Sequence, residues 1–584
     1  MGSFEIANDT FLLNGERFRL ISGAMHYFRV PRPYWRDRLE KLALMGCNTV
    51  ETYLPWNLHE PHSGAFDFQD DLDVEAYVRL AQEIGLWVIL RPSPYICGEF
   101  EFGGLPWWLL RDRAMRVRSS YAGFTAAVEH YYDQLMPRLA ALQITRGGPV
   151  IAMQIENEYG YYGNDSSYLV FLRDAMQRRG IDVPLFTSDG PWGHHLTWGS
   201  VDGALATANF GSGAPQHFKK LQALQSDKPL VCMEFWLGWF DAWRQSHHTR
   251  TPQDSAAALD EILAEGHANI YMFHGGTNFG FTSGANHAEH YTPDVTSYDY
   301  DAPLSEDGQC TPKFHALRDV IARYRDVPER QSSPAVAHAE PRELAVAGRA
   351  AVLPQLRQMV KPVASPLAQT MEDLNQGYGY VVYRLQIRGS DQDTALVLHR
   401  CADRALVYVD GAFVALRESG AMTDPIPLTI DASEHVLDIL VENQGRVNFG
   451  HRMDDQRKGI DGGVLINGCA AGPITHFSLP FDAPLSVTWT DESIASAPSL
   501  HRFELDYHAQ TGYHIDHFLN MDGWGKGIVI ANGRNLGRFW DAGPQRTLYL
   551  PGCFLQRGVN EIVVFETEGR YRDRLSVTGS PDLG

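Results

Sequence analysis

Eight apolar, strand-like stretches alternate with helix-like stretches over roughly the first 310 residues, and this alternation limits the fold more than any other feature. The expected strands are RLISGAMHYF (19 to 28), NTVETYLPW (48 to 56), LWVILRPSPY (86 to 95), VIAMQIENE (150 to 158), PLFTSDG (184 to 190), GALATANFG (203 to 211), PLVCMEFW (229 to 236) and NIYMFHGGTNFG (269 to 280). Between them, apolar residues recur at helical spacing, as at Phe124, Val128 and Tyr131. No GxGxxG follows a strand, which disfavours a dinucleotide-binding sheet. The pattern predicts a (β/α)8 TIM barrel over residues 1–326.

The pattern changes after the predicted barrel. Residues 327–343 are rich in Pro, Ser and charge, which is typical of a linker. Short alternating strands follow in two similar sets, each with a hairpin turn, Asp410-Gly411 in one and Asn532-Gly533 in the other. They predict two jelly-roll-like β-sandwich domains, over residues 344–484 and 485–584. Residues 344 to 380 could belong to either sandwich, so the first of these domains could be discontinuous.

Charge and cysteine content exclude several classes of protein. The net charge of −21 and the absence of a Lys/Arg run argue against nucleic acid and anionic membranes as partners. Seven scattered Cys without a CxxC pair indicate neither a disulfide framework nor a zinc site. No signal-peptide pattern or long apolar run is present, so we expect a cytoplasmic protein, although a periplasmic chain with its signal removed would look the same. The edge strands of the predicted sandwiches could pair with those of a second copy of the chain or be protected from pairing. Of these two cases we expect the first, a homodimer.

Two expected strands end in carboxylates beside other polar or aromatic residues. Glu158 follows Asn157 at the end of one apolar run, and Glu234 follows another. Either residue alone would fit a strand-end salt bridge, but one carboxyl from each of two strand ends is what glycoside hydrolysis requires. Glu156 lies two residues before Glu158, so strand alternation would place it on the same side and deeper in the barrel, in a supporting role.

Long stretches of the chain resemble glycoside hydrolase family 35, the β-galactosidases, of the short intracellular bacterial type. They are SGAMHYFRVPRPYWRDRL (22 to 39), NTVETYLPWNLHEP (48 to 61), LRPSPYICGEFEFGGLPWWL (90 to 109), QIENEYG (154 to 160), MEFWLGWFDAW (233 to 243), MFHGGTNFGF (272 to 281) and TSYDYDAPLSEDG (296 to 308). The C-terminal GRNLGRFWDAGPQRTLYLPG also resembles the family's galactose-binding-like sandwich. The resemblance implies a β-galactosidase that uses no cofactor.

Site residues follow from the resemblance position by position. Glu158 matches the acid/base and Glu234 the nucleophile of a retaining, exo-acting enzyme. The positions that match those holding the terminal galactose are Tyr53, Cys97, Gly98, Glu99, Asn157 and Tyr300. Trp236 stands where relatives have Tyr, which keeps an aromatic platform but removes a hydroxyl that could contact the nucleophile.

Several alternatives stay open from the sequence. Glu99 could instead form an ion pair with Arg91 or Arg111. His287 and His290 flank Glu289, but their spacing matches no metal site, and we expect no metal. The substrate is expected to be a β-galactoside oligosaccharide, with a hint of β-1,3 linkage from the resemblance. The rival functions are a related exo-β-glycosidase, such as a β-glucosaminidase, and a non-catalytic galactoside-binding protein.

Overall fold

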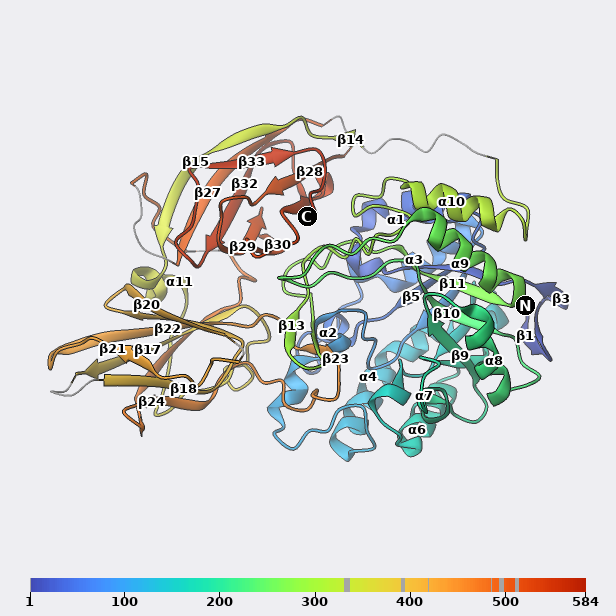
Figure 1. Cartoon of the computed structure of the whole chain (residues 1–584), viewed down its shortest axis with the longest axis horizontal. Coiled ribbons are helices and arrows are strands. Elements are labelled where there is room, and N and C mark those ends of the chain that lie inside the picture. The colour runs from blue at the N-terminus through green and yellow to red at the C-terminus, as the bar shows by residue number, and fades with distance from the viewer. Residues whose placement is uncertain are drawn as a thin grey trace.

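A closed barrel of eight parallel strands forms the N-terminal part of the protein (Figure 1). The computed structural model describes residues 2–329, 337–389, 394–418, 420–484, 486–492, 498–509 and 514–584. The barrel strands are β4 (Ile21–Met25), β5 (Thr49–Tyr53), β6 (Trp87–Arg91), β7 (Val150–Gln154), β8 (Leu185–Asp189), β9 (Leu205–Phe210), β10 (Val231–Trp236) and β11 (His267–His274). All eight lie within the stretches that the sequence predicted, except that β11 begins two residues earlier, and the predicted TIM barrel is confirmed.

Helices surround this barrel and bury their apolar stripes against it. They are α1 (Trp35–Met45), α2 (Trp56–His59), α3 (Val74–Ile84), α4 (Ala122–Ala140), α5 (Tyr159–Tyr162), α6 (Ser166–Arg178), α7 (His195–Gly199), α8 (Ala214–Leu224), α9 (Pro252–Glu265) and α10 (Pro312–Ile321). The stripe predicted in α4, which includes Phe124, Val128 and Tyr131, is fully buried. Helix α9 begins at Pro252, because the hydroxyl of the preceding Thr251 accepts a hydrogen bond from the backbone N–H of Asp254.

A small antiparallel sheet at the N-terminus covers one end of the barrel. It consists of β1 (Phe4–Ala7), β2 (Thr10–Leu13) and β3 (Glu16–Phe18). Phe4 and Phe11 are buried in the same core as Leu20 at the start of β4 and Ile151 in β7. These residues cover the N-terminal end of the parallel strands, and the carboxyl end is the one that carries the active site in barrels of this kind.

The first β-sandwich packs a six-stranded sheet against a four-stranded one. The larger sheet contains β16 (Val363–Ser365), β17 (Tyr380–Arg388), β19 (Arg404–Val409), β20 (Ala412–Glu418), β22 (Glu434–Glu442) and β26 (Ile474–Leu479). The smaller contains β18 (Thr394–Ala402), β21 (Ile426–Leu428), β24 (Gly459–Ile466) and β25 (Cys469–Ala470). Their inner faces share one core, to which Val381, Leu398 and Ile439 belong. A short helix, α11 (Leu356–Met359), precedes this sandwich.

The second sandwich is built from a nine-stranded sheet, which includes two strands that precede the first sandwich in the sequence. Its strands are β14 (Ala337–His338), β15 (Arg342–Ala351), β27 (Ser499–Tyr507), β28 (Ile515–Asn520), β29 (Lys526–Ala531), β30 (Arg534–Trp540), β31 (Thr547–Leu550), β32 (Gly558–Glu566) and β33 (Arg574–Thr578). β15 pairs with β27 and β33, whereas β16 pairs with β26 of the first sandwich, so residues 344 to 380 divide between the two. Residues 330–336 of the predicted linker lie outside the described part of the chain.

The two sandwiches repeat one three-stranded unit. β19 pairs with β20 and β22 around the turn at Asp410-Gly411, and β29 pairs with β30 and β32 around Asn532-Gly533. The Asp and Gly of one turn and the Asn and Gly of the other all have positive φ, as a tight two-residue hairpin requires. The repeated hairpins agree with the sequence prediction of two all-β domains.

A loop of the first sandwich reaches the open end of the barrel. β23 (Val447–Phe449) pairs in parallel with β12 (Ala285–His287), which pairs with β13 (Tyr291–Pro293) from the barrel domain. Just before β23, the buried guanidinium of Arg446 binds Glu101 of the barrel domain at 2.6 Å and Glu372 of the sandwich at 2.5 Å. The three strands lie between the barrel and the sandwiches in Figure 1.

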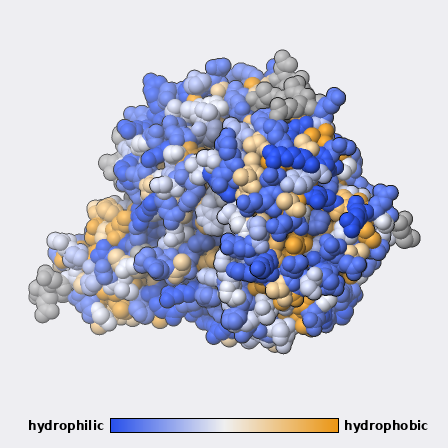
Figure 2. Space-filling model, turned by 45° about the vertical axis from the view of Figure 1, so that its right-hand side comes forward, coloured by the Kyte–Doolittle hydropathy of each residue, from blue (hydrophilic) through white to orange (hydrophobic). Residues whose placement is uncertain are grey.

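The surface is mostly hydrophilic on the face that Figure 2 shows, with hydrophobic side chains in separate groups. Among the described residues, no helix is long and apolar enough to cross a membrane.

Candidate active site

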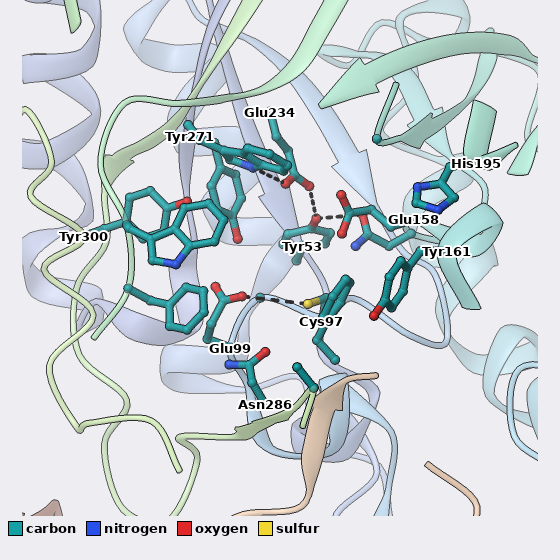
Figure 3. A pocket seen from close by; sticks show the side chains of 18 of the residues that line it. Tyr53, Cys97, Glu99, Glu158, Tyr161, His195, Glu234, Tyr271, Asn286 and Tyr300 are labelled. Atoms are coloured by element: carbon teal, nitrogen blue, oxygen red, sulfur yellow. Dashed lines mark hydrogen bonds between the residues drawn. The ribbon is translucent and has the colours of Figure 1, made fainter. Parts of the chain in front are cut away.

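A cavity of about 450 Å³ opens at the carboxyl ends of the barrel strands. It is lined by all nine residues that were predicted to be catalytic or to bind the substrate: Tyr53, Cys97, Gly98, Glu99, Asn157, Glu158, Glu234, Trp236 and Tyr300. Figure 3 shows the carboxylates of Glu158 and Glu234 on either side of the Tyr53 hydroxyl, with Glu99 below. Strands that are distant in the sequence therefore bring these side chains into one site, as the barrel topology requires.

The Glu234 carboxylate is held by donors on both of its oxygens. Its Oε1 accepts hydrogen bonds from the Tyr53 hydroxyl and from Nη2 of Arg91, each at 2.7 Å, and its Oε2 accepts one from Nε1 of Trp236 at 3.0 Å. The pairing register of β10 shifts between Cys232 and Phe235, an irregularity of the kind that re-aims a side chain. Two neutral donors and one guanidinium stabilise the charged form of this carboxylate.

The Trp236 contact resolves a question left by the sequence. A tryptophan in place of tyrosine removes a hydroxyl, but the indole N–H of Trp236 donates to the nucleophile candidate Glu234 from the same position. A donor to the carboxylate is therefore present despite the departure from the family pattern.

Glu158 has a different electrostatic environment. It follows β7, has a positive φ of 47°, and turns a half-buried carboxyl toward the cavity. Burial and then the negative charge of Glu234 raise its pKa to about 8, while a hydrogen bond that Nδ2 of Asn209 donates to Oε1 at 3.1 Å opposes the rise. Near neutral pH this group is therefore mostly protonated and can donate a proton.

Asn157 is oriented by donors that converge on its side-chain oxygen. Its Oδ1 accepts hydrogen bonds from Nη2 of Arg91 at 2.7 Å and from Nε2 of Gln154 at 3.1 Å, and it lies 2.9 Å from the Tyr53 hydroxyl, whose single hydrogen it shares with Glu234. This assignment leaves Nδ2 as the donor that faces the cavity. A sugar hydroxyl beside Glu234 would meet that N–H.

The loop Cys97-Gly98-Glu99 forms another wall of the cavity, with Cys97 and Glu99 below Tyr53 in Figure 3. All three residues have positive φ, and the thiol of Cys97 is buried with its pKa raised by burial. Burial also raises the pKa of Glu99 to about 7, partly offset by a hydrogen bond from the Tyr298 hydroxyl. Tyr300 completes this end of the cavity and is 4% exposed.

The ion-pair alternative for Glu99 and the expected position of Glu156 are wrong, whereas the expected supporting role of Glu156 agrees with its contacts. Glu99 does not form an ion pair with Arg91 or Arg111 within the described structure, because Arg91 binds Glu234 and Glu51, and Arg111 donates to Asn375. Glu156 is absent from the cavity lining.

Strand alternation fails for Glu156 because β7 ends at Gln154 and Glu156 itself has a φ of 56°. Its carboxylate turns to Arg118, at 2.8 and 2.9 Å, and to the hydroxyl of Tyr168 in α6. Arg118 also donates to the backbone carbonyl of Asn157 at 2.7 Å, so Glu156 supports the loop from outside the cavity.

Several lining or supporting residues were missed from the sequence. Arg91 and Asn209 lie at or near the end of an apolar strand, so the strand-end rule that selected Glu158 could have found them. Tyr161 and Phe449 also line the cavity, with their stacked ring centroids 4.4 Å apart. Phe449 comes from the first sandwich, and nothing in its local sequence indicates a place in the active site. Among the described residues, no group of three or more His, Cys, Asp or Glu could hold a metal ion.

Three models of known protein families match successive parts of the chain. The family model for glycosyl hydrolases family 35 matches residues 10–324. Two further models match the sandwiches, "Beta-galactosidase, first all-beta domain" at residues 368–480 and "Beta-galactosidase, galactose-binding domain" at residues 498–560.

Relatives in both animals and bacteria are similar over most of their length. The chain is 41% identical to beta-galactosidase-1-like protein 2 of Homo sapiens, over 98% of this chain and 91% of that protein. It is 42% identical to a beta-galactosidase of Xanthomonas manihotis over 94% of this chain and 91% of that one. It is 39% identical to a beta-galactosidase of Homo sapiens over 97% of this chain and 87% of that one. The chain therefore belongs to glycosyl hydrolases family 35.

Proposed function

We propose that this family 35 glycoside hydrolase is an exo-acting, retaining β-galactosidase that removes terminal β-D-galactose through a covalent galactosyl-enzyme. The observation that carries the proposal is the contrast between two carboxyl groups that face one cavity. Glu234 is stabilised as a carboxylate by Tyr53, Arg91 and Trp236, whereas burial and the charge of Glu234 raise the pKa of Glu158 to about 8. A nucleophile and an acid require this division of charge.

The first chemical step would break the glycosidic bond. Glu158 donates its proton to the glycosidic oxygen, and the Glu234 carboxylate attacks the anomeric carbon, so the leaving alcohol departs neutral and a galactosyl ester forms. In the second step the Glu158 carboxylate takes a proton from water, whose oxygen attacks the same carbon and releases Glu234 as a carboxylate. Two inversions give net retention. This mechanism needs the two carboxyl groups about 5 to 5.5 Å apart.

The neighbouring polar groups suit a terminal galactose. The N–H of Asn157 that faces the cavity would donate to the sugar 2-hydroxyl, a bond that strengthens as positive charge develops on the ring. Glu99 and Tyr53 would select the axial 4-hydroxyl and its neighbours, since buried polar groups reject a sugar that leaves them unpaired. The wall residues Cys97, Glu99 and Tyr300 are less than 10% exposed, so the cavity is closed to solvent on this side, which supports exo action.

The test compares p-nitrophenyl β-D-galactoside with the corresponding β-glucoside and β-N-acetylglucosaminide, using the wild type and Glu234→Gln. We expect turnover of the galactoside alone and a loss of nearly all activity in the variant, because glutamine cannot form the glycosyl ester. Preferred turnover of the glucosaminide would move the assignment to a related exo-β-glycosidase. Binding of galactosides in calorimetry without any turnover would favour the non-catalytic binding protein.

The β-1,3 linkage preference is part of the same proposal and rests on the sequence resemblance. Initial rates on the β-1,3-, β-1,4- and β-1,6-linked galactosyl-N-acetylglucosamine disaccharides would test it. The highest kcat/KM is expected for the β-1,3 isomer.

A further inference from the structure

A second cavity, of about 570 Å³, lies beside the active-site pocket, between the barrel domain and the first sandwich. We call it the outer cavity; it is lined by His287 and Tyr291 of the barrel domain and by residues of the sandwich, chiefly Asp403 and residues 451–452 and 454–458. Its volume is within the range of about 300 to 1,000 Å³ typical of small-molecule sites. The proposed hydrolysis of a terminal galactose assigns it no role.

The outer cavity shares part of its wall with the active-site pocket. His287 lines both cavities. His451, which lines the outer cavity, stacks on Tyr161 of the active-site pocket with ring centroids 5.0 Å apart and an angle of 16°. Tyr161 also stacks on Phe449 at 4.4 Å. The active-site pocket and the outer cavity therefore adjoin at His287 and at the stacked rings of Tyr161 and His451.

The floor of the outer cavity is a built, buried structure. Nζ of Lys458 binds both oxygens of Asp403, at 2.6 and 2.7 Å, and these side chains are 2% and 7% exposed. The Asp403 carboxylate also accepts a hydrogen bond from the backbone N–H of Gln444, and the Lys458 ammonium lies 5.0 Å from the centre of the Tyr291 ring. Because these groups hold one another, the floor presents a fixed surface to a ligand.

The charges of the lining favour a neutral ligand that is rich in hydroxyl groups. Three cationic side chains, Arg452, Arg457 and Lys458, are matched by three carboxylates, Asp403, Asp454 and Asp455. Such a balanced lining does not select an anion or a cation, but its guanidinium donors and carboxylate acceptors suit hydroxyls that both donate and accept. The ring of His451, which stacks on Tyr161 and lines the outer cavity, would pack against a sugar face.

We propose that the outer cavity binds the sugars beyond the first residue of the leaving group, so that the preferred substrate is a neutral oligosaccharide of at least three sugars. The inference rests on the proposed function, because the terminal galactose must sit between Glu158 and Glu234 for the rest of the chain to point outward. It goes beyond that function by naming the length and charge of the substrate.

The binding test uses Glu234→Gln with a neutral tetrasaccharide that carries a terminal β-1,3-linked galactose, in saturation-transfer NMR. We expect protons of the third and fourth sugars to receive saturation as well as those of the galactose. Arg452→Ala in the same background should weaken the signal of the third and fourth sugars relative to galactose. Saturation confined to the first two sugars would overturn the inference, whether or not the protein hydrolyses anything.

The kinetic test uses the ratio of kcat/KM for the tetrasaccharide to kcat/KM for the disaccharide with the same linkage. In the wild type this ratio should exceed one, and in Arg452→Ala and Asp455→Ala it should fall about three- to tenfold, the range expected for one lost hydrogen bond. Arg557→Ala, which removes an exposed arginine of the second sandwich, is the matched control and should leave the ratio unchanged.

The two proposals fail in different ways. A wild-type ratio of one, with good turnover of p-nitrophenyl β-D-galactoside, would refute the outer-cavity inference alone. No turnover of any galactoside, with saturation transfer to the third and fourth sugars, would refute the proposed hydrolysis and leave the extended binding site standing.

Discussion

The basic limb of the pH–rate profile should move when the hydrogen bond between Asn209 and Glu158 is removed. Nδ2 of Asn209 donates to Oε1 of Glu158 at 3.1 Å and stabilises its charged form, which opposes the rise of the pKa to about 8. Asn209→Leu keeps the size of the side chain but deletes this donor. The pKa of Glu158 should then rise further, because nothing stabilises the carboxylate from this side.

The size and sign of the shift follow from the bond. A hydrogen bond to a charged group is worth about 1.5 to 3 kcal/mol, and the lower value suits a neutral amide donor at this distance. Since 1.36 kcal/mol corresponds to one pKa unit, the shift should be about one unit upward. The acid must be protonated to act, so we expect activity to fall near pH 8 in the wild type but to persist to about pH 9 in Asn209→Leu.

The assay is kcat/KM for phenyl β-D-galactoside from about pH 5 to about pH 10, which reports ionisations of the free enzyme. Phenolate is a poor leaving group, so bond cleavage needs the proton of Glu158. Ser188→Ala is the matched control, because it removes the hydroxyl that donates to Oδ1 of Asn209 but keeps the Nδ2 donor to Glu158. The basic limb of the pH profile should therefore move less in Ser188→Ala than in Asn209→Leu. A limb that stays in place or moves to lower pH in Asn209→Leu would refute the reasoning.

Three further predictions follow from the same contacts. Glu158→Gln should lower kcat/KM for a galactosyl disaccharide about 10²- to 10⁴-fold. The rate of bond cleavage in p-nitrophenyl galactoside, measured by burst-phase kinetics, should fall far less, because p-nitrophenolate leaves without a proton. Equal losses for the two substrates would contradict the role of Glu158 as the acid. Tyr53→Phe removes a 2.7 Å donor to Glu234 and should lower kcat/KM about 10- to 150-fold with little change in thermal stability. Arg446→Met leaves Glu101 and Glu372 buried and unpaired, and calorimetry should show a lower unfolding temperature, consistent with a cost of about 3 to 5 kcal/mol; an unchanged temperature would show that the ion pairs contribute nothing.

The barrel could be predicted from the sequence because each buried parallel strand is a short apolar run whose end is marked by polar residues. That rule also placed Glu158 and Glu234 at one end of the barrel, where they line one cavity together with Tyr53, which the family resemblance supplied. The direction of Glu156 could not be predicted in this way. Positive φ angles at Glu156 and Glu158 break the alternation of side chains that the prediction assumed.

The parts of the site that come from other domains left no signal in the sequence. Phe449 reaches the cavity because β23 of the first sandwich pairs with β12 of the barrel domain, a contact between segments about 160 residues apart in the chain. The buried Arg446 beside it looks like an ordinary surface arginine until its partners Glu101 and Glu372 are placed. Long-range contacts of this kind depend on domain packing, which local patterns do not encode.

The most direct test of the central claim is the configuration of the sugar as it is first released. Phenyl β-D-galactoside would be mixed with the wild type in an NMR tube, and the anomeric proton signals followed before mutarotation equilibrates them. Double displacement through Glu234 predicts that β-galactose appears first and the α-anomer grows in later. Early release of α-galactose would mean a single displacement by water, and would contradict the assignment of Glu234 as the nucleophile.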